Sequence, residues 1–233
     1  MNNVRIHFIG TAHEDMLGAQ RLEKALQYEK PDIITVESSE VMMDYMENEG
    51  LPKIVKKINS LGLSATDTIF LIELLGEGGY ERKKSKAYAS KFGIPIYYVD
   101  DPSLVAGSVK AVLKMVDSSK KYFTEYLSSE YRAKVKVFLD KNYLLFQSLF
   151  DGEVPGSRSV EQDLVERIIQ TTPSASRDEI VAQNIEAIIK PGAKIVHVGG
   201  AFHSLRDVEG RTLFTRLRRY NPTRATLKWY EDK

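Results

Sequence analysis

The run Val4-Arg-Ile-His-Phe-Ile9 is followed directly by Gly10-Thr-Ala-His13. The first six residues are rich in branched and aromatic side chains, a pattern that predicts a buried strand. A glycine at the end of that strand permits a sharp turn and a close approach of backbone. We therefore expect His13 just past the carboxyl end of the strand, where open α/β sheets bind their ligands.

Further segments along the chain have the same strand-like character. They are Asp32–Glu37, Pro95–Val99 and Lys194–Val198, with Thr226–Tyr230 as a weaker candidate for an edge strand. The helical spacing of apolar residues predicts helices over Asp15–Glu29 and Tyr80–Phe92. Strands that alternate with helices predict an α/β fold, with a mainly parallel central sheet of four to five strands, flanking helices and right-handed crossovers.

A long, mostly helical region separates the third strand from the fourth. We expect residues 102–170 to form a helical insertion or lid within a single domain that spans residues 1–233; a second small helical domain is the alternative. Ser176-Arg-Asp-Glu179 matches a capping box, so a helix is predicted to begin there and to continue to Lys190.

The composition excludes several classes of protein. The chain has 233 residues, of which 42% are hydrophobic and 28% charged, with a net charge of +1. A balanced charge argues against nucleic acid or a membrane surface as the main partner. No apolar run reaches the roughly 18–20 residues of a membrane span, and the first ten residues lack the pattern of a signal peptide. We expect a cytoplasmic protein.

Cysteine is absent from the chain, so disulfides and thiolate metal sites are excluded. The final stretch, Arg216–Lys233, carries Trp229 and Tyr230. It is interpreted as either a homodimer edge or a covering strand.

All four histidines fall in two segments of the same form, His-x-x-Gly-x-x-His. One segment joins His7 to His13, and the other joins His197 to His203. The first histidine of each segment lies inside a predicted strand and is expected to pack in the core or to support the site. The second lies past the strand end, so His13 and His203 are the candidate functional residues.

Carboxylates follow two of the other predicted strands. Glu37 ends the second strand, and Asp100 and Asp101 follow the third. Arg177, near a helix start, would hold a substrate carboxylate or stabilise an oxyanion. Two imidazoles and one to three carboxylates at one sheet edge suit a divalent metal ion. They suit a metal-free acid/base mechanism equally well, and the residues leave both open.

These residues, in this order, resemble the TraB/Tiki family, which is grouped with the erythromycin-esterase-like and ChaN-like proteins. The resemblance runs from residue 4 to about 217 and rests on the following segments: Phe8-Ile-Gly-Thr-Ala-His13, Pro31-Asp-Ile-Ile-Thr-Val-Glu37, Arg177-Asp-Glu179 and Val196-His-Val-Gly-Gly-Ala-Phe-His203. It implies a parallel-rich α/β core with its site at the strand ends. Carried over residue by residue, it implies a core site of His13, Glu37 and His203, with Arg177 as the supporting cation. Asp100 matches an acidic position of relatives, whereas Asp101 stands where many TraB-like members have arginine.

The activities of the relatives differ. Tiki-like members are metal-dependent proteases that use a manganese- or cobalt-type ion, and erythromycin-esterase-like members hydrolyse a lactone with histidine as the base. ChaN-like members are associated with haem, and TraB-like members limit peptide-pheromone signalling.

We therefore expect a hydrolase of a peptide or small-molecule ester, with a divalent metal ion held by His13, Glu37 and His203. Asp100 or Glu37 would be the base, and Arg177 would stabilise the developing negative charge. One alternative is a non-catalytic binding protein for a signalling peptide or haem. Another is a scaffold in which both motifs serve packing.

Overall fold

A parallel β-sheet of five strands forms the centre of the molecule. The computed structural model describes residues 4–13, 15–71, 79–104, 114, 127–154, 156–171 and 174–233. The strands are β1 (Arg5–Thr11), β2 (Ile33–Val36), β3 (Ile96–Tyr98), β4 (Lys194–Gly200) and β5 (Thr223–Thr226). Every pairing between neighbours is parallel, and the order across the sheet is β3-β2-β4-β1-β5. The predicted α/β fold class is confirmed.

The strand order brings the two histidine motifs together. β4 lies between β1 and β2, so the strands that precede His13 and His203 are direct neighbours. In their register Gly10 lies opposite Gly199, and Thr11 lies opposite Gly200. Because the strands are parallel, the residues that follow β1, β4 and β2 all meet at one edge of the sheet.

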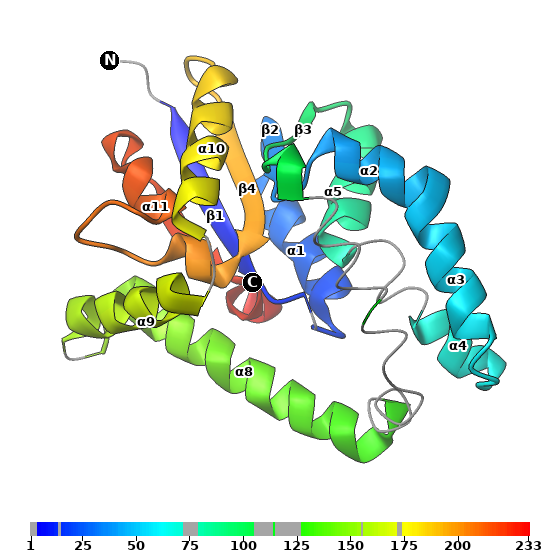
Figure 1. Cartoon of the computed structure of the whole chain (residues 1–233). Coiled ribbons are helices and arrows are strands. Elements are labelled where there is room, and N and C mark those ends of the chain that lie inside the picture. Colours follow the sequence, from blue (N-terminus) through cyan, green and yellow to red (C-terminus); the bar gives the residue numbers. More distant parts are fainter. Residues whose placement is uncertain are drawn as a thin grey trace.

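Helices cover both faces of this sheet (Figure 1). The α-helices are α1 (Gly18–Glu29), α2 (Glu40–Tyr45), α3 (Leu51–Asn59), α4 (Ala65–Leu71), α5 (Tyr80–Phe92), α8 (Ser129–Asp151), α9 (Ser157–Thr171), α10 (Ser174–Ala187) and α11 (Leu213–Arg216). Helices α1 and α5 pack on one face, and α10 and α11 pack on the other. A turn of π-helix over Met46–Gly50 joins α2 to α3.

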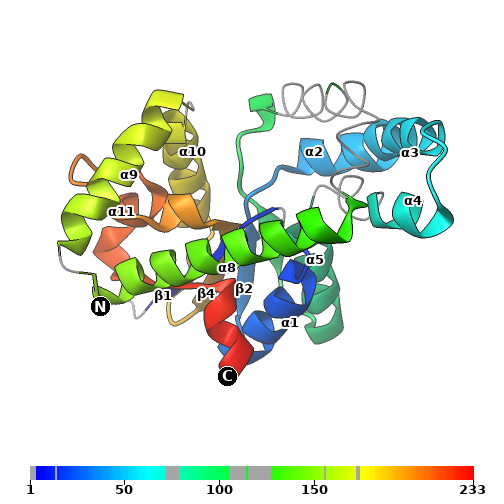
Figure 2. The same cartoon turned by 90° about the horizontal axis from the view of Figure 1, so that it is seen from below.

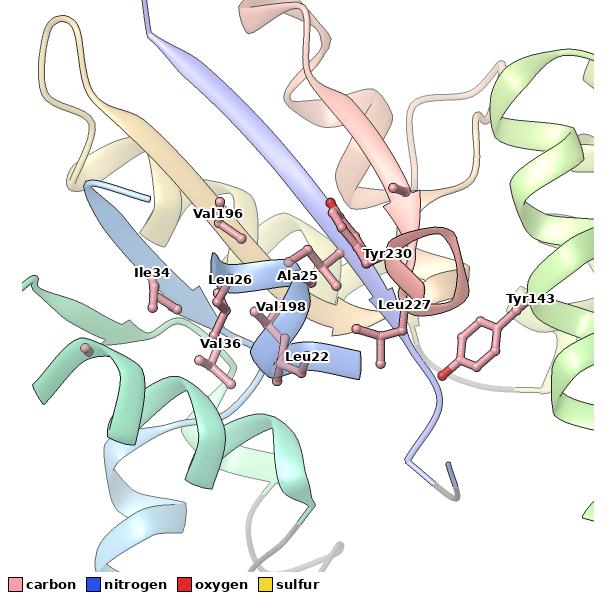
Figure 3. Close-up of a cluster of buried hydrophobic side chains, with 13 residues drawn as sticks. Leu22, Ala25, Leu26, Ile34, Val36, Tyr143, Val196, Val198, Leu227 and Tyr230 are labelled. Carbon is pink, nitrogen blue, oxygen red and sulfur yellow. The ribbon is translucent and has the colours of Figure 1, made fainter. Parts of the chain in front are cut away.

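Two cores result from the alternation of side chains along each strand. On one face Ile9, Ile34 and Val198 pack against Leu22 and Leu26 of α1 (Figure 3). On the other face Ile6, Phe8 and Ile195 pack against α10 and α11. A sheet covered on both faces explains why the strands read as nearly continuous apolar runs.

The helical character predicted for residues 102–170 is confirmed where the structure describes it. Helix α8 has 23 residues, and α9, which ends at Thr171, has 15, while residues 105–113 and 115–126 lie outside the described residues. Seen from below, α8 runs across the molecule in front of the sheet (Figure 2). In the described part of the chain no helix combines the length and hydropathy needed to cross a bilayer. That the chain is a single domain stays a prediction.

Two local predictions are wrong. The last strand is Thr223–Thr226, and the predicted strand Thr226–Tyr230 is instead mostly a 3-10 helix over Leu227–Asp232. The chain turns there because the Tyr230 ring is buried and its hydroxyl donates to Glu29 Oε1 at 2.7 Å. The capping box also fails, since α10 begins at Ser174 and places Ser176 inside the helix.

Candidate functional site

Two glycines let the motif strands and Glu37 approach one another closely. A Cβ on Gly10 would lie 3.0 Å from both Cα and Cβ of Ala201, so the first motif packs directly against the second. A Cβ on Gly199 would lie 2.7 Å from Glu37 Oε2 and 2.7 Å from His197 Nε2. The site thus depends on glycine for close approach of neighbouring atoms.

Glu37 is the buried centre of the site. Its Oε2 accepts a hydrogen bond from the backbone N–H of Gly200 at 2.6 Å. Its Oε1 lies 2.6 Å from Arg177 Nη2 and 3.2 Å from His203 Nε2. Burial alone would raise the pKa of Glu37, but the charges of His203 and Arg177 hold that pKa well below its ordinary value. Glu37 is therefore an anion that binds two cationic side chains.

Arg177 links Glu37 to Asp100. Its Nε donates to Asp100 Oδ1 at 2.7 Å, and its Nη2 donates to Oδ2 at 2.5 Å, which makes a bidentate pair. The same Nη2 faces Glu37, so one guanidinium pairs with both of the carboxylates that follow β2 and β3. Asp101 instead accepts from the backbone N–H of Ser103, which places its carboxylate in the local turn.

His203 is held between two carboxylates. Its Nδ1 lies 2.5 Å from Asp178 Oδ1, and Asp178 Oδ2 accepts from the backbone N–H of Leu213. Its Nε2 faces Glu37. Burial would lower the pKa of His203, but Glu37 and Asp178 outweigh it and raise that pKa to about 10. His203 is thus an imidazolium at neutral pH.

His13 is the exposed member of the site, with 69% of its side chain accessible. Its Nδ1 lies 2.9 Å from Oε1 of the buried Glu81, in the first turn of α5. The hydrogen bond to Glu81 raises the pKa of His13. The charges of Glu37 and Arg177 also act on that pKa, so His13 is electrostatically part of the same site.

Two tyrosines fix the backbone just before His13. The hydroxyl of Tyr143 accepts from the N–H of Ala12 at 3.0 Å, and the hydroxyl of Tyr80 donates to the carbonyl of Ala12 at 3.1 Å. Tyr143 reaches from α8 toward the end of β1 (Figure 3). The helical insertion therefore holds the first motif, which favours a fixed wall over a lid.

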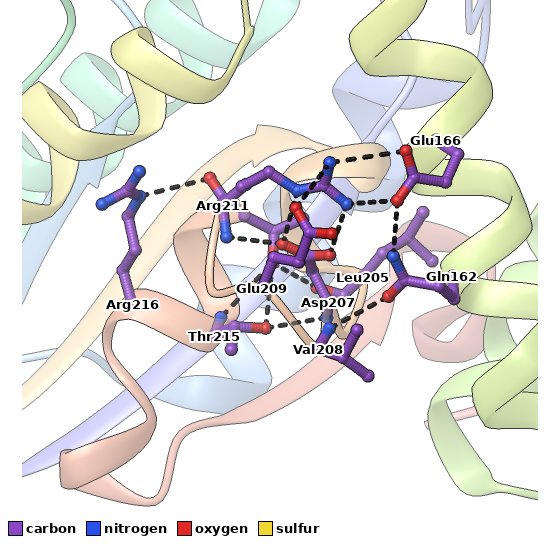
Figure 4. Close-up of polar contacts among 10 residues, drawn as sticks. Gln162, Glu166, Leu205, Asp207, Val208, Glu209, Arg211, Thr215 and Arg216 are labelled. Carbon is purple, nitrogen blue, oxygen red and sulfur yellow. Dashed lines mark hydrogen bonds and ion pairs between the residues drawn. The ribbon is translucent and has the colours of Figure 1, made fainter.

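The second motif is anchored to the insertion as well. Glu161 of α9 is fully buried and accepts from Arg224 at 2.8 and 2.9 Å and from the N–H of Arg206 at 2.5 Å. Arg224 also donates to the carbonyl of Ser204, next to His203. Further along the loop, Arg211 bonds to Asp207 and to Glu166 of α9 (Figure 4).

His7 and His197 lie inside β1 and β4, away from solvent. His7 Nδ1 bonds to Thr223 Oγ1 at 2.7 Å, and its Nε2 bonds to the Tyr230 hydroxyl at 2.6 Å. His197 Nδ1 bonds to Thr35 Oγ1 at 3.0 Å. Burial lowers the pKa of each to about 4, so both are neutral at pH 7. These positions agree with supporting roles.

The structure brings Glu37, Asp100, Arg177 and His203 into one chain of contacts and places His13 beside it. Sequence reasoning missed Glu81 as the partner of His13. The only indication was an acidic residue in the first turn of the helix predicted over Tyr80–Phe92. Asp178 follows Arg177 directly in the sequence, but its bond to His203 depends on how α10 packs.

The predicted metal ligands are not assembled as a set. Among the described residues no group of three or more His, Asp or Glu side chains is placed to hold a metal ion. Glu37 Oε1 already contacts the Arg177 guanidinium, and His13 turns to Glu81. As arranged, His13, Glu37 and His203 do not fit a divalent ion.

Comparisons with known proteins add little to this geometry. A stretch of 111 residues is 32% identical to an uncharacterized protein of Methanocaldococcus jannaschii, and the match covers 43% of this chain and 28% of that protein. No family model matches the chain, and no solved structure matches it. The TraB/Tiki resemblance therefore stays a prediction.

Proposed function

We propose that the chain is a hydrolase that cleaves a peptide or ester bond at the carboxyl edge of β1, β4 and β2. The observation that carries this proposal is the contact of one buried carboxylate, Glu37, with both His203 and Arg177. Two cations fixed in this way are preorganised to stabilise negative charge that develops on a carbonyl oxygen. The TraB/Tiki resemblance supports the same reaction class.

Arg177 has donors left for a substrate. Its Nε and Nη2 are used by Asp100 and Glu37, whereas Nη1 bonds to no residue in the described ranges. A guanidinium held by carboxylates at Nε and Nη2 keeps the two N–H groups of Nη1 as donors in a fixed orientation. Such a pair suits a carbonyl oxygen that becomes an oxyanion.

His13 supplies the exchangeable proton. Its ring is exposed, while His203 and Arg177 are more buried. Glu81 raises the pKa of His13 to about 9, so the neutral form of His13 becomes more populated as pH rises toward that value. In that neutral form His13 would take a proton from an attacking water and return it to the leaving group. The half-exposed Phe202, beside His203 and in edge contact with Phe146, offers an apolar surface to the substrate.

The first test compares hydrolysis of a panel of peptides and esters by the wild type and by Arg177→Met. Removal of one preorganised donor to an oxyanion costs about 10²–10³ in kcat. Arg219→Met is the matched control, because Arg219 is exposed on the surface and pairs with Glu186. Equal activity of wild type and Arg177→Met would contradict the proposal.

Metal dependence is measured on the same protein. Elemental analysis and chelator treatment are applied to the wild type, His13→Ala and His203→Ala. Activity that survives the chelator supports the metal-free form described here. If the wild type contains a manganese- or cobalt-type ion, and both variants lose the ion and the hydrolytic activity, the metal-dependent form would be established. Peptide or haem binding without turnover would favour the binding-protein alternative.

A further inference from the structure

His13 and His203 each bond through Nδ1 to one buried carboxylate on a helix. His13 meets Glu81 of α5 at 2.9 Å, and His203 meets Asp178 of α10 at 2.5 Å. The side chains of Glu81 and Asp178 are only 6% and 5% exposed. Helices α5 and α10 cover opposite faces of the sheet (Figure 1), so the two pairs are built independently.

A carboxylate on Nδ1 has a defined effect on an imidazole. It fixes the orientation of the ring and keeps the proton on Nδ1, which leaves Nε2 for chemistry. Burying a carboxylate is costly unless its oxygens find partners. Two such placements, one beside His13 and one beside His203, indicate that both carboxylates are there to orient these rings.

The two pairs differ in how many carboxylates face the histidine and in how exposed its ring is. Both ring nitrogens of His203 face carboxylate oxygens, Asp178 on one side and Glu37 on the other, so both must carry a proton. Asp178 is itself satisfied, since its second oxygen binds the Leu213 N–H. His13 faces a single carboxylate, and most of its ring is exposed. The second oxygen of Glu81 is buried without a hydrogen-bond partner in the described part of the chain.

We propose that Glu81 and Asp178 are positioning residues that give His13 and His203 different roles. Glu81 holds His13 as the group that exchanges protons with substrate, and Asp178 locks His203 as a fixed donor that never releases its proton during turnover. The roles in turnover rest on the proposed function, whereas the two pairings can be tested without it.

The chain is well suited to a direct measurement, because it contains only four histidines. In protein labelled with 15N-histidine, long-range 1H–15N spectra report the protonation of each ring nitrogen. His13→Gln and His203→Gln assign the signals of His13 and His203. The signals of the buried His7 and His197 are the references for an intact fold. At pH 7 we expect both rings to be doubly protonated, because their carboxylate partners raise the pKa of His13 to about 9 and that of His203 to about 10. As pH rises, we expect the exposed His13 to lose its proton before His203 does. A neutral His203, or identical behaviour of the two residues, would overturn the proposal.

The partners are tested with Glu81→Gln and Asp178→Asn. Glu81→Gln should alter only the His13 signals, and Asp178→Asn only the His203 signals. The wild-type spectra decide the protonation states even if one variant fails to fold. A Glu81→Gln protein that is folded and has unchanged His13 signals would contradict the role of Glu81.

Activity supplies a second readout. Loss of an orienting carboxylate typically costs about 10–100-fold, so kcat should fall by that factor in Glu81→Gln, with KM little changed. The pH profile of kcat should also shift to lower pH, because Glu81 raises the pKa of His13 while Glu37 and Arg177 act on it in opposite directions. Glu23→Gln, an exposed partner of Lys84, is the matched control. Without any wild-type activity the proposed hydrolase fails, and the spectra still decide the pairings.

Discussion

At the scale of the residue, the candidate site depends on atoms that approach closely and on charges that neutralise one another. Glu37 would be an unstable buried anion if it stood alone, because an unpaired charge in the interior is strongly disfavoured. Arg177, His203 and the Gly200 N–H together make it stable. Removal of one partner should therefore leave a buried charge uncompensated, and the effect will exceed the loss of one contact.

Gly199→Ala tests the close approach. The added methyl would lie 2.7 Å from both Glu37 Oε2 and His197 Nε2, so one of these side chains must move. Overpacking of this kind costs about 1–3 kcal/mol, and we expect a lower free energy of unfolding in chemical denaturation. Gly200→Ala is the matched control, since its methyl would meet its nearest neighbour, His203 Cδ2, at 3.4 Å. Equal destabilisation by the two variants would contradict this account.

At the scale of the element, α8 and α9 contact the two motifs directly, a support that the sequence pattern of residues 102–170 does not predict. Tyr143 of α8 binds the backbone before His13, and Glu161 of α9 binds the backbone after His203. Gln147 of α8 also accepts from the N–H of Thr226 in β5. The insertion thus connects the ends of three strands, and its packing sets the geometry of the site.

Tyr143→Phe tests this connection. The change removes the acceptor for the Ala12 N–H, at a net cost of about 1 kcal/mol, and frees the turn that carries His13. We expect a lower kcat with only a small loss of stability, measured by kinetics and thermal unfolding of the same samples. Tyr28→Phe is the control, because Tyr28 is exposed and meets Trp229 and Tyr230 through ring contacts. Full activity of Tyr143→Phe would show that the hydrogen bond from the Ala12 N–H to Tyr143 is not needed for activity.

Much of the fold and part of the site followed from local sequence patterns. Four strands were predicted because each is a short apolar run bounded by turn residues, and Glu37 and His203 stood out because they follow such runs. The position of β4 between β1 and β2 was not predictable, since pairing order depends on contacts far apart in the chain. The bond between His13 and Glu81 was not predictable either, because these residues are also far apart in the chain. The last strand was misplaced because Tyr230 fits a strand pattern, yet its hydroxyl is needed by His7 and Glu29.

At the scale of the whole molecule, the histidines make stability depend on pH in two opposite ways. His7 and His197 have a folded-state pKa of about 4, below the ordinary value of 6.5. The unfolded chain therefore binds protons first as pH falls, and stability is lost between pH 6.5 and about 4. His13 and His203 have raised pKa values of about 9 and about 10, so their contributions are complete below pH 6.5 and are lost as pH rises toward those values. The contribution of His13 is the smaller one, because its side chain is 69% exposed and its ion pair is screened by solvent.

We therefore expect these histidines to give the thermal midpoint a maximum near pH 6.5, measured by calorimetry across pH 4–10. His197→Gln should flatten the acid side of the curve and leave the alkaline side unchanged. His203→Gln should flatten the alkaline side, to which His13 also contributes, and leave the acid side unchanged. An acid side that is unaltered in His197→Gln would show that other groups control it.

The central position of β4 also has a consequence for synthesis of the chain. Both neighbours of β1 lie far from it along the chain, because β1 pairs with residues 194–200 and 223–226. While the chain is being made, β1 therefore has no strand to pair with until residues 194–226 have been synthesised. Folds dominated by such distant pairings form slowly and expose apolar edges while they wait. The nascent protein should therefore depend on protection by chaperones until β4 and β5 have emerged.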